Sequence, residues 1–376
     1  MTADRSLDVH TSVGTLPDAQ WNDVVARSPL GSVFHRTEWL RAVERGIDVT
    51  PRHVTVSRDG TLVGLLPNVL SDVDLPIGLP GPASGLAPRE LVSVEPGFGG
   101  PIVTGDHEQV LDRLLEGVRT AATGDVWAHR MRAVAPAASQ YADHLDGRGY
   151  DVSTLTCQLV ADLTGSPESV FERWDKERRR TARKAREAGM TVQDVEPDPA
   201  TLDAFYDAYA AMIDRVDGVR FPRSFFAALA ECLGERLVLF RADLDGEAVG
   251  WHLYLRDDEG DSLHHFFSGL RAEHFGLHPS SRLHEHGVEW ASEEGYATYN
   301  FGESVADVTD GGFRYKAQYG GTVEPVLTWE RGLAPVRWGA FRVARRLYRT
   351  YRARTGDVSA ASRAERADSQ PRTRRR

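Results

Sequence analysis

The sequence predicts a mixed α/β fold divided into two successive domains. The chain has 376 residues, enough for two domains that each bury a core of their own. Amphipathic segments with helical periodicity alternate with short β-type segments in both halves, and a basic segment closes the chain. We therefore expect a first domain over residues 1–154, a second over residues 155–332, and a basic amphipathic helix with a disordered tail over residues 333–376.

The first half alternates helices and strands. Short helices are expected over residues 19–27 and 32–45. The segment "PRHVTVSRDGTLVGLLPNVLS" then alternates apolar and polar residues around Arg-Asp-Gly, which predicts a β-hairpin. Residues 75–101 are rich in glycine and proline and are expected to form a loop. The amphipathic helix "DHEQVLDRLLEGVRTAATGD" comes next, followed by "VWAHRMRAV", a helix near residues 141–147, and "DVSTLTCQLVADL".

The second half repeats this alternation. One helix is expected to begin after Ser166 as N-cap, with Pro167 at its first position, and to end at Gly189. A second helix is "TLDAFYDAYAAMIDRV", and three antiparallel strands joined at Asp-Gly and Asp-Glu-Gly-Asp follow over residues 235–270. The helix "PSSRLHEHGVEWASEEG" ends at Gly295 and precedes the strand "YATYNFGES", which leads into a loop that carries Lys316.

Composition and charge exclude several classes of protein. The chain is 41% hydrophobic and 27% charged, which is typical of a globular domain in water. No run of 18 apolar residues and no signal peptide is found, so we expect a cytoplasmic location. Residues 331–376 hold 14 arginines against three acids, a net charge of +11, whereas the remainder holds 31 basic and 52 acidic residues, or −21. A site for a polyanion must therefore be local.

Four segments carry a family resemblance. They are "SVFHRTEW", the arginine-rich "KERRRTARKAREAGMTV", the run that ends in "YATYNFGES", and "GGFRYKAQYGG". In this order, and with three strands followed by a helix and a strand, the chain resembles the FemAB-like branch of the GNAT acyltransferase superfamily over residues 31–330. The resemblance implies two GNAT-like acyl-CoA N-acyltransferase folds in tandem.

The resemblance also implies a reaction. Members of this branch transfer an acyl or aminoacyl group from acyl-CoA or aminoacyl-tRNA to an amine, with no permanently bound cofactor. The acceptor amine is carried by a small molecule, a sugar or a lipid-linked molecule. A positioned donor or cation must stabilise the oxyanion that develops, and a proton acceptor must take up the amine's proton. Matching "YKAQYGG" to the family element implies that Lys316 is a cation facing the acyl carbonyl or a donor phosphate, with Tyr315 beside it. Glu303 and Asp310 flank this loop, and either could accept the amine's proton.

Two further regions are candidates for binding the donor's phosphates. The predicted helix between residues 176 and 186 has seven cationic side chains and one acid, and like charges at helical spacing repel unless an anion binds between them. A solvated helix face is the alternative interpretation. Ser280 and Ser281 begin the helix that in GNAT domains points its N-terminus at the donor's pyrophosphate. The expected phosphate-binding residues are Arg179, Arg180, Arg183, Lys184, Arg186, Ser280 and Ser281.

The histidines and cysteines do not predict a metal site. Cys157 and Cys232 stand alone, and His274, His278, His284 and His286 lack metal-ligand spacing. His264 and His265 adjoin in a strand and so point to opposite faces, which allows only one of them to face a site. We expect His252 and either of these two to be hydrogen-bonded within the sheet rather than to act as general bases.

The arginine-rich end of the chain has two alternative roles. In "VRWGAFRVARRLYRTYRARTG" helical spacing is expected to place Phe341, Ala344, Leu347, Tyr348 and Tyr351 on one face. Such a helix could contact the inner face of a membrane peripherally through residues 336–354, or dock on its own domain. From residue 357 onward the chain is too polar to bury itself. A rival to catalysis is a non-catalytic RNA- or membrane-binding module on a decayed transferase fold.

Overall fold

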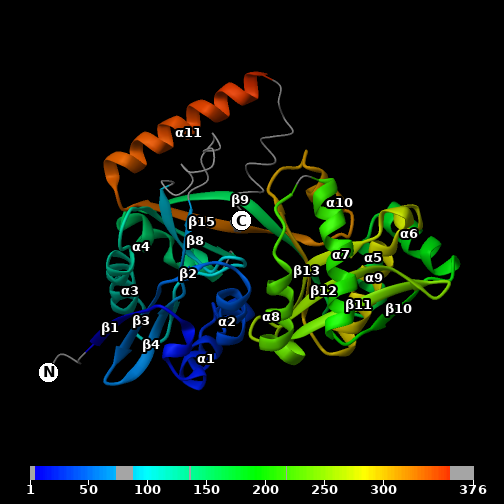
Figure 1. Cartoon of the computed structure of the whole chain (residues 1–376), viewed down its shortest axis with the longest axis horizontal. Coiled ribbons are helices and arrows are strands. Elements are labelled where there is room, and N and C mark those ends of the chain that lie inside the picture. The colour runs from blue at the N-terminus through cyan, green and yellow to red at the C-terminus, as the bar shows by residue number, and fades with distance from the viewer. Residues whose placement is uncertain (1–4, 73–87, 135–136, 217, 356–376) are drawn as a thin grey trace. The chain divides into compact units, whose positions relative to one another are not determined.

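The computed structural model describes residues 5–72, 88–134, 137–216 and 218–355, with the side chains of 348–355 outside the description (Figure 1). The predicted disordered tail lies outside the described residues. Two compact units are present, residues 1–155 with 326–376 and residues 156–325. Each unit combines helices with a mixed β-sheet, so the predicted mixed α/β class is confirmed. Within the described residues, no helix has the length and apolar character needed to cross a bilayer.

The first unit contains two sheets. One is antiparallel with strand order β1-β3-β4-β7, and in the other β2, β5, β6, β8 and the end of β15 are neighbours in that order, with β6 and β8 parallel. The elements are β1 (Arg5–His10), η1 (Val13–Thr15), α1 (Asp18–Arg27), η2 (Val33–His35), α2 (Thr37–Gly46), β2 (Thr50–Pro51), β3 (His53–Arg58), β4 (Thr61–Leu66), β5 (Val69–Asp72), β6 (Arg89–Ser93), β7 (Ile102–Val103), α3 (His107–Ala121), β8 (Val126–Val134), η4 (Ala137–Tyr141), α4 (Ala142–Gly147) and α11 (Pro335–Thr355). Two further strands, β9 (Asp151–Asp162) and β15 (Thr322–Gly332), are each divided between the two units.

Helix α3 packs closely on the antiparallel sheet of the first unit. A Cβ atom on Gly64 would lie 2.5 Å from Val110 Cγ1, and one on Gly117 would lie 2.3 Å from Val54 Cγ1. Glycine at both positions therefore lets the helix and the strands approach. The predicted hairpin around Arg-Asp-Gly is present as β3 and β4. The expectation of a loop throughout 75–101 is wrong in part, because Arg89–Ser93 forms the buried strand β6 between β5 and β8.

The second unit is built on one mixed sheet. Its strands follow the order β10-β11-β12-β13-β14-β9, and only β13 and β14 are parallel. The three antiparallel strands expected over residues 235–270 are β11, β12 and β13. The elements are α5 (Pro167–Arg173), α6 (Lys176–Glu187), β10 (Thr191–Asp194), α7 (Pro199–Arg215), α8 (Arg223–Leu233), η5 (Gly234–Arg236), β11 (Leu237–Leu244), β12 (Glu247–Asp257), β13 (Ser262–Leu270), η6 (Ala272–Leu277), α9 (Pro279–Glu293), β14 (Thr298–Val305) and α10 (Gly311–Ala317).

The helix expected from Pro167 to Gly189 is two helices. Trp174 has an extended ψ of 142°, and Asp175 begins α6 by accepting a hydrogen bond from the Arg178 amide. The Trp174 ring is buried edge-on against Tyr319, with ring centroids 4.8 Å apart. Burial of this large ring and the aspartate cap together favour a break over a continuous helix. The break sets the direction of α6 beside α9.

Candidate functional site

Lys316 lies in the second unit on helix α10, not in the predicted loop. Asp310 begins this helix, because its carboxylate accepts hydrogen bonds from the amides of Gly312 and Phe313. The Lys316 Nζ donates a hydrogen bond to the main-chain oxygen of Glu303 over 2.7 Å. Burial, opposed by the charge of Glu303, lowers the pKa of Lys316 to about 8. The ammonium group of this partly buried lysine is therefore charged at neutral pH.

Two parallel strands, β13 and β14, separate beside Lys316, so their main chains no longer pair there. β13 and β14 pair only over the three residue pairs from Ser262–Thr298 to His264–Asn300, although both strands continue. Gly302 follows the separation with φ of +88°. A Cβ atom there would lie 2.9 Å from the His265 carbonyl oxygen and 3.0 Å from Lys316 Nζ. Both the backbone conformation and the space therefore require glycine at this position.

Hydroxyl groups connect α10 to the start of α9. The Tyr315 hydroxyl donates to Ser280 Oγ over 2.8 Å and lies 2.7 Å from the Tyr319 hydroxyl. Tyr319 is fully buried and is 3.3 Å from Ser281 Oγ, which in turn is 3.0 Å from Thr181 Oγ1 on α6. The network therefore joins α6, α9 and α10 at the N-terminal end of α9.

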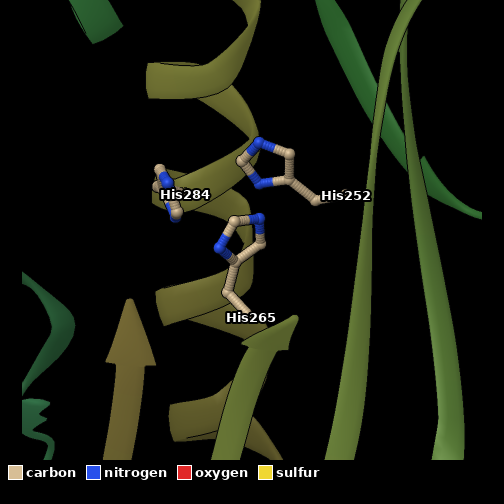
Figure 2. A group of neighbouring side chains, drawn as sticks. All are labelled: His252, His265 and His284. Atoms are coloured by element: carbon tan, nitrogen blue, oxygen red, sulfur yellow. The ribbon is translucent and has the colours of Figure 1, made fainter. Parts of the chain in front are cut away.

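A β-bulge brings three histidines together on the face that α9 covers. Leu253 pairs with Phe267 and Tyr254 with His265, so Phe266 is the extra residue. As a result His265 shares a face with Tyr254, and His252 lies on that face two residues along β12. Figure 2 shows the rings of His252 and His265 turned toward His284 of α9. The prediction that only one of His264 and His265 faces a site agrees with this geometry, because His264 pairs with Asp257 at 3.2 Å.

The rings of His252 and His284 belong to one continuous hydrogen-bond chain, whereas His265 bonds separately to the Phe301 carbonyl and Ser268. Ser280 Oγ lies 3.2 Å from His252 Nε2, and His252 Nδ1 lies 3.1 Å from the Tyr254 hydroxyl. Tyr299 donates to Tyr254 over 3.0 Å, and its oxygen is 2.8 Å from His284 Nδ1. Because Tyr254 donates to the Leu283 carbonyl, a consistent set of protons puts hydrogen on Nδ1 of His252. Ser280 then donates to Nε2.

Among the described residues, the same three rings form the group that could bind one metal ion together. Their candidate ligand atoms all lie within 4.8 Å of one another. Burial lowers the pKa of His265 to about 3 and the pKa values of His252 and His284 well below 6.5, so the rings are neutral. Five of their six ring nitrogens already have hydrogen-bond partners, and Lys316 adds positive charge beside them. This arrangement favours a hydrogen-bond network over a cation site.

The cations of α6 divide into two groups. Arg180, Arg183 and Arg186 have acidic partners, which are Glu177 at 2.7 Å, Glu187 at 3.8 Å and Glu285 at 3.5 Å. The expectation of a stripe without compensating acids is therefore wrong for these three, and Arg179 is exposed on the same helix.

Two other cations of α6, Lys184 and Arg178, lie by the start of α9. Lys184 Nζ donates to the Gly276 carbonyl over 3.3 Å, and Arg178 lies over the Tyr315 ring at 5.1 Å. Together with burial, their charges lower the pKa of His278, the residue before α9. The N-terminus of α9 is thus surrounded by positive charge.

The structure brings together five of the residues expected from sequence. Tyr315, Ser280 and Ser281 share one hydroxyl network through Tyr319, Lys316 beside Tyr315 donates to the Glu303 main chain, and Lys184 donates to the Gly276 carbonyl. Sequence analysis missed Arg178, Thr181, Tyr319 and the meeting of His252, His265 and His284. Arg178 lies in the basic segment at residues 176–186, so plotting this segment on a helical wheel that starts after Asp175 could have selected it. The histidines carry no sequence signal, because their meeting depends on the bulge at Phe266.

Comparisons with known proteins agree with this architecture. Residues 174–317 match the family model of the acetyltransferase (GNAT) domain. A solved structure of FemX is 14% identical, covering 90% of this chain and 99% of that chain with a TM-score of 0.66. A tandem GNAT protein from the clavulanic acid biosynthesis pathway is 13% identical, covering 88% and 98% with a TM-score of 0.54.

A third solved structure is the C-terminal domain of a putative lysylphosphatidylglycerol synthetase from Agrobacterium fabrum. It is 13% identical, covering 87% of this chain and 94% of that chain with a TM-score of 0.54. No curated protein matches the chain in sequence. Taken together, these comparisons show an acetyltransferase (GNAT) domain match over residues 174–317 and a fold that the whole chain shares with FemX and the tandem GNAT protein.

Proposed function

We propose that the protein is an N-acyltransferase that moves an acyl or aminoacyl group from a phosphate-bearing donor to an amine. The observation that carries the proposal is the Lys316 ammonium held by the Glu303 carbonyl, next in sequence to Tyr315, whose hydroxyl donates to Ser280 at the cationic start of α9. The segment that contains this arrangement is also the one that matches the acetyltransferase domain. The site therefore combines a cation for the reacting carbonyl with a binding region for the donor.

The donor's phosphates are proposed to bind at the N-terminus of α9. The positive end of a helix dipole and nearby cations favour an anion, and Lys184 and Arg178 supply the cations. Arg179, exposed on the same helix, would extend this region outward. An acyl-CoA presents a diphosphate and an aminoacyl-tRNA presents a phosphodiester backbone, so either donor suits the region. Acyl-CoA is the first choice because the matched family is that of acetyltransferases.

The transfer step needs one stabilised charge and one proton acceptor. The amine attacks the carbonyl carbon of the thioester or ester, the oxygen becomes negative, and the Lys316 ammonium stabilises it in a low-dielectric site. The bond to the thiol or the ribose oxygen then breaks. The amine's proton passes to Glu303 or to water, and the leaving group takes up a proton from Tyr315 or solvent. Tyr315 suits the last role because Ser280 and Tyr319 hold its hydroxyl in place.

The acceptor is proposed to be an amine on a small molecule, a sugar or a lipid-linked molecule. The neighbour from Agrobacterium fabrum is named for lysylphosphatidylglycerol, which is a lipid product, and its similarity in fold supports testing lipid acceptors first. Three lysines in the whole chain make modification of its own surface amines easy to recognise as a side reaction.

Calorimetric titration of acetyl-CoA into the purified chain tests the donor. Micromolar binding, roughly −8 kcal/mol, would support a CoA donor, and thiol release would then be measured against a panel of amines. Absence of heat at millimolar acetyl-CoA would refute that donor, and a gel-shift titration with aminoacyl-tRNA would follow. Binding of RNA or vesicles without transfer, and unaffected by Lys316→Met, would instead support the non-catalytic alternative.

A further inference from the structure

Helix α11 has one apolar face packed against its own unit. Trp338 and Phe341 are buried against Ala128 of β8, with Trp127 beside them. Of the residues expected on one apolar face, Phe341 is 7% exposed whereas Leu347 is 66% exposed. The packed face therefore accounts for only part of the helix's apolar character.

A second apolar stripe of α11 faces solvent. Val336, Val343 and Leu347 are 86%, 61% and 66% exposed, and they are among the most exposed large hydrophobic residues in the described chain. Spacings of seven and four residues put the three side chains on one line along the helix. Solvent-exposed apolar side chains occur singly on most proteins, whereas an aligned set marks a surface that binds something.

The same helix carries a large positive charge. Its 21 residues include seven arginines and no acid. Arg337 pairs with Asp125, Arg342 with Asp151, and Arg345 with Glu330. The first two pairs are about half exposed, and exposed pairs contribute little stability, so such arginines can exchange an acid for an external anion.

A hollow beside the stripe adds space for a polar group. Its volume is about 520 Å³, and it lies between α11 and the turn at residues 149–151. Trp338, Arg342 and Arg346 are among the residues that line it. An apolar stripe, neighbouring arginines and a tryptophan at a polar hollow are the features that bind interfacial lipid, with acyl chains beneath and phosphate groups around.

We propose that α11 is a docking surface for an anionic lipid bilayer. The helix would lie in the plane of the membrane, with Val336, Val343 and Leu347 inserted between lipids and the arginines at the headgroup phosphates. A second copy of the chain fits less well, because pairing two such helices would bring seven arginines of each together. The inference is independent of the proposed transfer reaction, since all of its residues lie in the first unit and the reaction is assigned to the second.

Vesicle sedimentation with the full chain tests this inference. The probes are vesicles of phosphatidylglycerol with phosphatidylethanolamine and, for comparison, vesicles of phosphatidylcholine. We expect the chain to bind the anionic vesicles at least about tenfold more tightly, and less tightly as salt rises. The variant Val343→Asp with Leu347→Asp should lose about tenfold or more of this binding, since two apolar side chains no longer insert. Val216→Asp is the matched control, because Val216 is 58% exposed in the second unit.

Three outcomes would overturn the inference. They are equal binding to both kinds of vesicle, equal binding by the variant and the control, and failure of the unmodified chain to bind anionic vesicles. Circular dichroism shows whether the variants are folded. We expect them to fold, because the substituted positions are exposed. Analytical ultracentrifugation tests the remaining alternative, in which the stripe binds a second copy of the chain. A dimer that becomes a monomer on Val343→Asp substitution would support that alternative. A failed thiol-release assay would leave the vesicle result unaffected.

Discussion

Lys316 and Glu303 are joined through a main-chain oxygen rather than through their side-chain charges. The ammonium group donates to the Glu303 carbonyl over 2.7 Å, at the place where β13 and β14 have separated. A carbonyl oxygen orients the lysine but does not neutralise it, so the positive charge remains available to a ligand. This relationship is the basis for the first two predictions.

Replacing Lys316 with methionine should reduce acyl transfer by about 10²–10³-fold, the range found when one oxyanion-stabilising group is removed. The apolar side chain fills a similar volume, so the melting temperature should not fall. Thiol release from acetyl-CoA measures the first quantity and thermal unfolding the second. Lys176→Met is the control, since Lys176 is exposed on α6. An unchanged rate in Lys316→Met would remove this lysine from the reaction.

The stability of the protein should rise between pH 7 and 9.5 relative to Lys316→Met. Burial lowers the pKa of Lys316 to about 8, below the unfolded value of 10.5, so the unfolded chain holds the proton more tightly. Between these two pKa values the unfolded state binds more protons, and stability increases with pH. The gain by pH 9.5 should be about 2 kcal/mol, an order-of-magnitude value.

Urea unfolding of both proteins at the two pH values measures this difference. The charged groups near Lys316 include Glu303 and Asp310, and the Cys157 thiol, whose pKa burial raises, also lies near it. The comparison with Lys316→Met cancels their common contributions. A difference that is flat with pH would show that Lys316 is solvated rather than buried.

Lys184→Ala should weaken acetyl-CoA binding about tenfold, close to 1.4 kcal/mol, because it removes a charge beside the start of α9. Arg183→Ala should change binding little, since Arg183 is exposed and pairs with Glu187 on the same helix. Calorimetry at two salt concentrations measures both, and the difference should shrink at high salt. Equal losses in the two variants would indicate a diffuse electrostatic effect instead of a local phosphate site.

Gly302→Ala should destabilise the protein by about 1–2 kcal/mol more than Gly246→Ala does. Both glycines have positive φ, +88° and +82°, so both substitutions strain the backbone. Only Gly302 has close neighbours, the His265 carbonyl and Lys316 Nζ, whereas nothing lies within 4 Å of a Cβ on Gly246. Chemical unfolding gives the two free energies, and equal losses would contradict the close approach at Gly302.

Much of the fold could be predicted from the sequence, because local patterns determine local structure. Apolar periodicity predicted the hairpin of β3 and β4 and the strands β11 to β13, and Pro167 marked the start of α5. Other boundaries could not be predicted. Periodicity alone cannot show that burial of Trp174 against Tyr319 divides one expected helix into two.

The candidate site, like the fold, could be predicted from the sequence only in part. The segment "GGFRYKAQYGG" was sufficient to select Lys316 and Tyr315, because an isolated lysine between aromatic residues is an unusual local feature. It did not show that the lysine is on a helix, nor that a carbonyl oxygen is its partner. Those facts depend on Asp310 capping α10 and on the separation of two strands, which are relations between segments.

The sequence by itself determined the class of fold, the order of its elements and the short motifs that carry charge or hydroxyl groups. Tertiary structure alone decided which of those groups meet. One extra residue, Phe266, turns His265 toward His252 and His284. Acidic partners on α6 and α9 engage Arg180, Arg183 and Arg186, so the charge on α6 is uneven. Spacing along one segment fixes which face a side chain occupies, whereas packing between segments fixes what that face contacts.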